Sequence, residues 1–241
     1  MEYWYKEHFN EDYLLIYKHR NDARAQSELK SLMSFIPYHK DQKILDLCCG
    51  AGRHSRWFWE NGLQVTGVDL SSTLLNEAEK YQQSRDIHYI QSDMRNIDFD
   101  EEFDLVANLF TSFGYFQEDI ENEQVLKNVY KALKEDGYFL FDYLNPAFIK
   151  QNLIPFSKEV IEETSIFQYR TIENDTVVKK IRIEDHSSRR TYEERVKLYS
   201  SEQLKMMLEK NGLKVIHTLG HYDGTPYDEN HSSRLIYICQ K

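Results

Sequence analysis

A short strand that runs into a glycine turn carries the clearest chemical signal in this sequence. Residues 43–47 are mostly apolar, and the turn Cys48-Cys49-Gly50-Ala51-Gly52 follows at once, ahead of a helical pattern. Glycines allow the chain to reverse and leave backbone N–H groups free to face a ligand where a helix begins. A second strand, Gln64–Val68, ends at Asp69, about 20 residues beyond the glycines, where doubly wound folds hydrogen-bond a ribose. This order predicts a site for a cofactor that contains a nucleoside.

The glycine pattern separates two cofactors that such a site can take. NAD sites favour G-x-G-x-x-G, but Ser55 stands here where the third glycine would be. Asp46 lies at the end of the first strand, shortly before Gly50, and this arrangement resembles the S-adenosylmethionine motif. An NAD-binding oxidoreductase is therefore the weaker alternative.

Over residues 40–145 the sequence resembles the class I S-adenosylmethionine-dependent methyltransferases. Asp46, Gly50 and Gly52 match the acidic residue and the second and third glycines of the family pattern acidic-x-Gly-x-Gly-x-Gly, while Cys48 replaces the first glycine. The resemblance implies that these four residues surround S-adenosylmethionine as the cofactor, with the Cys48 side chain beside the turn.

Two more segments match the family where the next strands end. Asp69, followed by Leu70, matches the position that binds the ribose hydroxyls. Asp93 and Met94 follow the strand at 87–90 and match the segment that holds adenine, with Asp93 toward the exocyclic amine and Met94 against the ring. Three matches in register indicate the family far more strongly than one glycine turn.

The loop Asn108–Phe116, after the fourth strand, is expected beside the methyl group. Methyltransferases that act on exocyclic amines of bases resemble one another in an Asn/Asp-Pro-Pro-aromatic motif there, but this loop contains no proline, which disfavours base N-methylation. Because the methyl group on a positive sulfur is already activated, the enzyme mainly has to align the acceptor atom with it. We therefore expect no strong sequence motif of catalytic residues. Asn108 is a candidate contact of the cofactor as well as of the acceptor. The candidates for lining the acceptor site are Asn108, Thr111, Phe113, Tyr115 and Arg234.

A helix is expected to begin near Asn10, a good N-cap, and to carry Tyr13 and Tyr17 on one face. In families like this one, an N-terminal helix often folds over the cofactor. The resemblance therefore makes the Tyr13 hydroxyl a candidate partner of the methionine carboxylate, with core packing as the alternative. A second helix is expected to stop at Pro37, and the spacing suits helices laid against a sheet edge.

Composition narrows the class of partner. The 241 residues carry a formal net charge of −10, whereas proteins that grip a nucleic-acid backbone concentrate Lys and Arg. The N-terminus has no apolar signal core, and no stretch is apolar for long enough to span a bilayer. Three cysteines without a disulfide framework suit a reducing cytoplasm. We therefore expect a cytoplasmic protein with a small-molecule substrate, no nucleic acid, no membrane and no metal.

Strands and helices alternate between residues 44 and 143. This predicts an α/β fold: a Rossmann-like, seven-stranded, mostly parallel sheet with helices on both faces. Acidic residues at the strand ends should then line one crevice. The runs Leu213–Leu219 and Leu235–Cys239 predict an antiparallel hairpin at the sheet edge, and the family also ends on an antiparallel strand.

An insertion interrupts this alternation. Three extended runs with short turns predict a small antiparallel sheet, near Val160–Thr171, Thr176–Ile183 and Thr191–Leu198. The chain thus divides into a methyltransferase domain with N-terminal helices, 1–154 and 200–241, and an inserted β lid, 155–199. The lid is a substrate-facing cover or the surface of a candidate homodimer, and a plain cover for the sheet edge is the alternative.

The leading prediction is an enzyme that moves a methyl group from S-adenosylmethionine to N, O or C of a small molecule by in-line displacement. A non-catalytic module that binds S-adenosylmethionine or a partner protein is one alternative, and methylation of RNA or protein is another. The charged side chains on the lid strands, including Arg190 and Glu194, are expected on solvated faces where they pair with one another.

Overall fold

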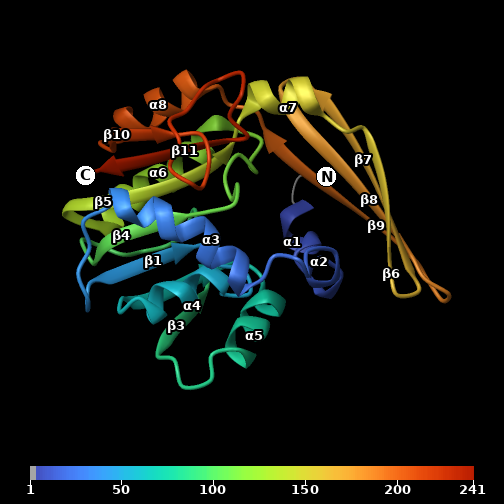
Figure 1. Cartoon of the computed structure of the whole chain (residues 1–241), viewed down its shortest axis with the longest axis horizontal. Helices are drawn as coiled ribbons and strands as arrows, with labels where there is room; N and C mark the ends of the chain where they lie inside the picture. Colours follow the sequence, from blue (N-terminus) through green and yellow to red (C-terminus); the bar gives the residue numbers. More distant parts are fainter. Residues whose placement is uncertain (1–3) are drawn as a thin grey trace.

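The computed structural model describes residues 4–241. Residues 1–3, which open the predicted methyltransferase domain, lie outside the described residues. Two sheets face each other across the N-terminal helices (Figure 1). The large sheet has seven strands, in the spatial order β10 (Lys214–Leu219), β11 (Arg234–Gln240), β5 (Leu133–Leu144), β4 (Phe103–Asn108), β1 (Lys43–Leu47), β2 (Gln64–Asp69) and β3 (Ile87–Gln91).

The strand directions confirm the predicted fold class. The pairs from β5 through β4, β1 and β2 to β3 are all parallel, whereas β11 runs antiparallel to both β5 and β10. Parallel neighbours end at the same edge of a sheet, so Leu47, Asp69 and Asn108 come to one edge, where ligands bind in open α/β sheets. The predicted hairpin of the last two strands is also present, and β11 lies inside the sheet next to β5.

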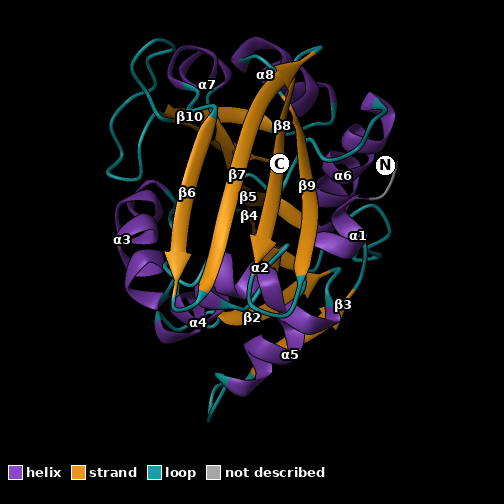
Figure 2. Cartoon of the chain, turned by 90° about the vertical axis from the view of Figure 1, so that its right-hand side faces the viewer, coloured by secondary structure: helices purple, strands orange, loops and turns teal. Residues whose placement is uncertain are grey.

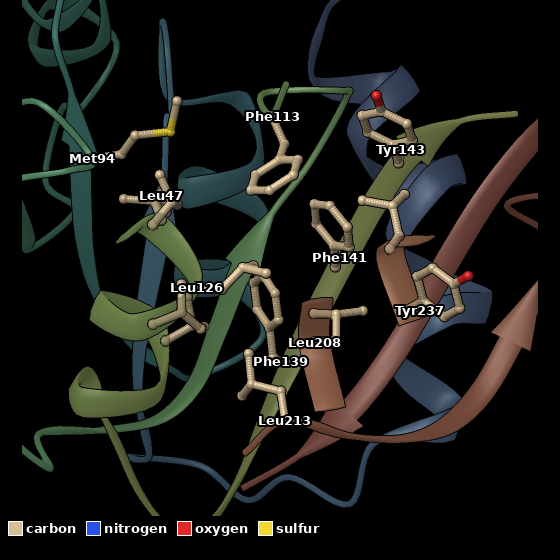
Figure 3. Close-up of a cluster of buried hydrophobic side chains, with 14 of the residues drawn as sticks. Leu47, Met94, Phe113, Leu126, Phe139, Phe141, Tyr143, Leu208, Leu213 and Tyr237 are labelled. Carbon is tan, nitrogen blue, oxygen red and sulfur yellow. The ribbon is translucent and has the colours of Figure 1, made fainter. Parts of the chain in front are cut away.

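Helices cover both faces of the large sheet. Successive residues of a strand point to opposite faces, so along β1 Ile44 packs with the core under α3 (Asp22–Leu32) and α4 (Arg53–Glu60), whereas Leu45 packs with the other core. That second core includes Phe139, Phe141 and Leu126 and is shown in Figure 3. It lies under α6 (Asp119–Ala132) and α8 (Ser201–Lys210), and α5 (Ser72–Lys80) packs against β2 and β3.

The second sheet has four antiparallel strands, shown in front of the large sheet in Figure 2: β6 (Phe156–Ile161), β7 (Thr164–Glu173), β8 (Thr176–Glu184) and β9 (Arg189–Lys197). The prediction of three strands was wrong in count. The first predicted run, Val160–Thr171, breaks into two strands at a tight turn where Glu162 has φ +55°. No glycine or proline marks that turn in the sequence. The helix α7 (Pro146–Asn152) leads from β5 into this sheet.

Two short helices, α1 (Trp4–His8) and α2 (Glu11–Ile16), lie between the large sheet and β9 (Figure 1). Asn10 caps α2, as predicted, because its Oδ1 accepts a hydrogen bond from the Asp12 N–H at 2.9 Å. The expected place of this helix at a sheet edge was wrong. Aromatic packing holds the segment against the loop after β4 instead, with the Trp4 ring 5.0 Å from that of Tyr115. The 3₁₀ turn Met33–Phe35 continues α3 toward β1.

Candidate functional site

A cavity of about 810 Å³ lies beyond the carboxyl ends of β1, β2 and β4, between the large sheet, α2 and the lid strands. Cavities of roughly 300–1,000 Å³ hold drug-sized ligands. Four of the predicted site residues, Asp46, Gly52, Asn108 and Phe113, lie outside its wall. The structure brings these predicted residues together in the wall: Tyr13, Cys48, Gly50, Asp69, Leu70, Asp93, Met94, Thr111, Tyr115 and Arg234.

The turn after β1 uses left-handed backbone at alternate residues. The φ angle is +64° at Cys48, +55° at Gly50 and +74° at Gly52. A side chain at Gly52 would collide with the Tyr89 hydroxyl, whereas one at Gly50 would meet no atom closer than 3.8 Å. Cys48 therefore occupies a conformation that favours glycine, and open space lies beside Gly50 for a ligand that approaches the backbone.

Two aspartates hold this turn from either side. Asp69 Oδ2 accepts a hydrogen bond from the Gly50 N–H at 2.9 Å, and its Oδ1 accepts one from the Ser71 N–H at 2.8 Å. Burial raises the pKa of Asp69 to about 6, against the opposing effect of those N–H groups. Asp46 is buried below the turn and accepts a hydrogen bond from the Ser55 hydroxyl at 2.5 Å. Asp46 thus supports the turn from the core.

Asp93 lies at the far end of the cavity with Met94. Its Oδ2 accepts a hydrogen bond from Arg95 Nη2 at 2.6 Å, and Arg95 also pairs with Glu121 at 2.6 Å. Burial alone would raise the pKa of Asp93, but the hydrogen bonds from Arg95 hold it below its usual value. Met94 Sδ lies 3.5 Å from Cys48 Sγ, so the two sulfur atoms line the wall side by side.

The loop after β4 begins with two left-handed residues, Phe110 at φ +61° and Thr111 at φ +60°. Asp142, buried at the end of β5, accepts a hydrogen bond from the Phe110 N–H at 2.8 Å. Asp142 also accepts one from Arg234 Nε at 2.8 Å, and Arg234 Nη2 donates to Thr111 Oγ1 at 2.7 Å. Arg234 therefore acts on the loop through Asp142 and Thr111, a network that the sequence did not reveal.

The structure places two predicted acceptor residues in the core. The Phe113 ring is 1% exposed and packs 5.1 Å from the Phe141 ring (Figure 3). Asn108 is fully buried and donates from Nδ2 to the Leu47 carbonyl at 3.1 Å, while its Oδ1 has no hydrogen-bond partner among residues 4–241. Phe110 lines the wall together with the predicted Tyr115, and Phe110 was not predicted from the sequence.

Three arginines surround the Phe110 ring. The guanidinium carbons of Arg20, Arg53 and Arg234 lie 4.0, 5.1 and 5.7 Å from its centre. Arg53 begins α4, and its Nη1 lies 2.7 Å from Glu28, yet neither of its buried Nη atoms has a hydrogen-bond acceptor in the described part of the chain. Arg20 and Arg53 were not predicted from the sequence, although Arg53 directly follows the glycine turn, a position that could have indicated a ligand contact.

The lid contributes charge to the cavity as well. Glu194 from β9 and Lys179 from β8 both line the wall, with 3.4 Å between Lys179 Nζ and Glu194 Oε2. The Tyr17 hydroxyl donates to Glu194 Oε1 at 2.7 Å, and His8 Nε2 lies 2.7 Å from the same oxygen. The solvated face predicted for Glu194 was wrong, because α1 and α2 cover that face of β9. Arg190 does pair at the surface, but with Asp12 and Asp185.

The described residues contain no group of three His, Cys, Asp or Glu side chains that could hold a metal ion. Within residues 4–241, every helix is too short or too polar to cross a membrane.

The cavity lies at the carboxyl edge of a doubly wound sheet, where such folds bind nucleoside cofactors, and this defines the protein broadly as a doubly wound, nucleoside-cofactor-binding fold. Residues 44–137 match the family model described as a methyltransferase domain. The putative methyltransferase YqeM of Bacillus subtilis is 38% identical over 124 residues, which are 46% of this chain and 50% of YqeM. The cypemycin N-terminal methyltransferase of a Streptomyces species is 24% identical over 86% of this chain and 88% of its own length.

A solved S-adenosylmethionine-dependent methyltransferase from Clostridium acetobutylicum has the same fold, with a TM-score of 0.81 and 22% identity over 95% of each chain. The chain spans about half the length of YqeM and most of the cypemycin enzyme. The predicted class is confirmed: the chain carries a methyltransferase domain of the class I S-adenosylmethionine-dependent type.

Proposed function

We propose that this protein transfers the methyl group of S-adenosylmethionine to a small molecule that binds under the lid. The observation that carries the proposal is one continuous cavity. It contains residues matched to the cofactor, and it extends into a chamber lined by the loop after β4, α2 and the lid strands. Such a chamber admits a small acceptor, whereas a folded macromolecule is kept outside by the lid.

The cofactor fits the residues present. Asp69, which lines the cavity, is the proposed acceptor of hydrogen bonds from the ribose hydroxyls, and Asp93 with Met94 forms the end of the cavity proposed for adenine. The open space beside Gly50 leaves the backbone accessible to the methionine part. Arg53, which pairs with Glu28 through Nη1 and whose buried Nη2 has no hydrogen-bond acceptor in the described chain, is the proposed partner of the methionine carboxylate together with Tyr13.

S-adenosylmethionine supplies, when bound, a methyl group already activated by a positive sulfur. The acceptor's lone pair would form the bond to the methyl carbon as the carbon–sulfur bond breaks, the electron pair would remain on sulfur, S-adenosylhomocysteine would leave, and any proton lost by the acceptor would pass to solvent. The protein contributes alignment and exclusion of water. Phe110, held at the wall by Asp142, and the rings of Tyr13 and Tyr115 provide the apolar surroundings for that step.

The first experiment is calorimetric titration with S-adenosylmethionine, S-adenosylhomocysteine and NAD. Micromolar binding of the two sulfur compounds without NAD binding is the expected result, and release of S-adenosylhomocysteine is then measured with a panel of small acceptors. NAD binding alone would restore the oxidoreductase alternative. Tight cofactor binding with no release on any acceptor would favour a non-catalytic binding module.

A second candidate acceptor is the N-terminus of a peptide, favoured by the similarity to the cypemycin N-terminal methyltransferase over 86% of this chain. A flexible chain end is narrow enough to enter the chamber. Paired peptides with free and acetylated N-termini test this candidate, because only the free amine would then lead to S-adenosylhomocysteine release.

A further inference from the structure

The lid side of the cavity carries more positive than negative charge. Arg20, Arg170, Lys179 and Glu194 all line it. Glu194 pairs with Lys179, but within residues 4–241 neither Arg20 nor Arg170 forms an ion pair with a carboxylate; Arg170 donates to Ser157 Oγ at 3.1 Å and to neutral oxygens nearby. Both side chains are partly exposed and line the cavity, so two cations face it without a carboxylate partner among the described residues.

The Arg20 guanidinium lies between two aromatic rings. Its guanidinium carbon lies 3.6 Å from the centre of the Tyr17 ring and 4.0 Å from that of the Phe110 ring. One edge donates from Nη1 to the Tyr13 hydroxyl at 3.2 Å, while the buried Nε has no acceptor in the described chain. A guanidinium fixed between two rings loses little further freedom when it binds a carboxylate or phosphate.

Arg20 and Arg53 serve different parts of the cavity. Arg53 belongs to the start of α4, directly after the glycine turn, and its near carboxylate is Glu28. Arg20 stacks on Tyr17, whose hydroxyl meets Glu194 and Lys179 of the lid. Arg53 is therefore the proposed partner of the methionine carboxylate, whereas Arg20, which also donates to the Tyr13 hydroxyl, lies between the proposed cofactor site and the lid residues.

We propose that the acceptor carries a carboxylate or phosphate group, which binds between Arg20 and the lid residues Arg170 and Lys179. This inference rests on the proposed function and names the substrate class of the same site. The apolar side chains of Val177 and Val196 line the chamber beside these cations, so an apolar body attached to the anion fits the same wall. Burial lowers the pKa of Lys179; Glu194 opposes this, while Arg170 and Arg20 lower it further.

The test uses the whole protein loaded with S-adenosylhomocysteine, so that the methionine carboxylate site is filled. Benzoate, phenyl phosphate and the neutral benzamide are titrated by calorimetry into this complex. We expect benzoate or phenyl phosphate to bind at least tenfold more tightly than benzamide, and the tighter of the two anions identifies the group. Arg20→Gln and Arg170→Gln should each weaken the anion at least fivefold, and Arg170→Gln, whose side chain contacts no proposed cofactor residue, should leave S-adenosylhomocysteine affinity within twofold.

Arg182→Gln is the matched control, because Arg182 lies on the neighbouring lid strand β8 but pairs with Glu184 and stays outside the cavity wall. It should change neither affinity. Equal binding of the three probes, or unchanged anion affinity in both Arg20→Gln and Arg170→Gln, would overturn the inference alone. No binding of S-adenosylhomocysteine to the unaltered protein would instead overturn the proposed function and this inference with it.

Discussion

Asp69 couples proton binding to cofactor binding. Burial raises its pKa to about 6, and two ribose hydroxyls need an ionised carboxylate as their acceptor. We expect the Kd for S-adenosylhomocysteine to rise up to about tenfold between pH 7 and pH 5, since the ionised fraction falls by roughly that factor. Calorimetric titration over this range measures the effect. Asp69→Asn should bind more weakly at pH 7 and show a flat profile, and an equally steep profile in this variant would assign the titration elsewhere.

The same residue predicts how stability depends on pH in the ligand-free protein. The folded pKa of Asp69 lies above the unfolded value of about 3.9, so the folded state binds the proton more tightly. This group therefore lowers the free energy of unfolding as the pH rises from about 4 to 6. Urea unfolding of the protein and of Asp69→Asn at both pH values measures the contribution, which should be present only in the protein with the carboxyl.

Cys48 stands where the family pattern has glycine, and its φ of +64° costs an L-residue about 1–2 kcal/mol. Cys48→Gly removes this cost but also loses the packing of the thiol on Met94, so we expect the free energy of unfolding to change by less than about 1 kcal/mol. Cys48→Val should lower it by roughly 1–3 kcal/mol, because a β-branched side chain resists this conformation. Chemical unfolding of the three proteins ranks them, and a valine variant as stable as the glycine variant would contradict the argument.

At the scale of the elements, the loop after β4 depends on β5 and β11. Asp142 accepts hydrogen bonds from Phe110, Tyr222 and Arg234, and Asp142→Asn leaves Arg234 buried without its counter-charge. We expect the free energy of unfolding to fall by about 3–5 kcal/mol, with a loss of methyl transfer in the protein that remains folded. The control is Asp98→Asn, which removes an exposed pair with Lys131 and should have no measurable effect. Equal stability of the two variants would contradict the role of Asp142.

The sequence predicted those elements whose signals are local. The glycine turn, Asp69 and the N-cap Asn10 depend on residues a few positions apart, and the structure places them as expected. The strand break at Glu162 has no local signal.

Whether a charged side chain is exposed depends on packing by segments that lie far away in the sequence. The sequence pattern predicts a solvated strand residue at Glu194, but α1 covers it in the fold. Arg20 stacks on Phe110, which lies far along the chain, as well as on the nearby Tyr17. The prediction that Phe113 lines the acceptor site was wrong for the same reason. The fold decides which aromatic rings of this loop face the cavity, and Phe113 packs on Phe141 in the core.

At the scale of the whole molecule, the cavity exists because two sheets close on the N-terminal helices. Glu194 of β9 joins the lid strands to the N-terminal helices. Its carboxylate is surrounded by His8 from α1, Tyr17 after α2 and Lys179 from β8. Burial alone would raise its pKa, but Lys179 and His8 hold the pKa well below the usual value, so the carboxylate stays ionised. This contact ties the lid strands to the N-terminal helices at the wall of the cavity.

Glu194→Gln tests whether that contact closes the cavity. The amide keeps the size of the side chain but leaves Lys179 buried without a counter-charge, so β9 and residues 4–17 should separate from each other more often. We expect amide hydrogen exchange in those two segments to accelerate at least tenfold, which corresponds to about 1.4 kcal/mol, while the strands of the large sheet keep their protection. Glu193→Gln is the control, because Glu193 lies on the opposite face of β9 and pairs with Lys180 and Arg195. Acceleration spread evenly over both sheets would show that Glu194 stabilises the fold as a whole, and the lid would then open by another contact.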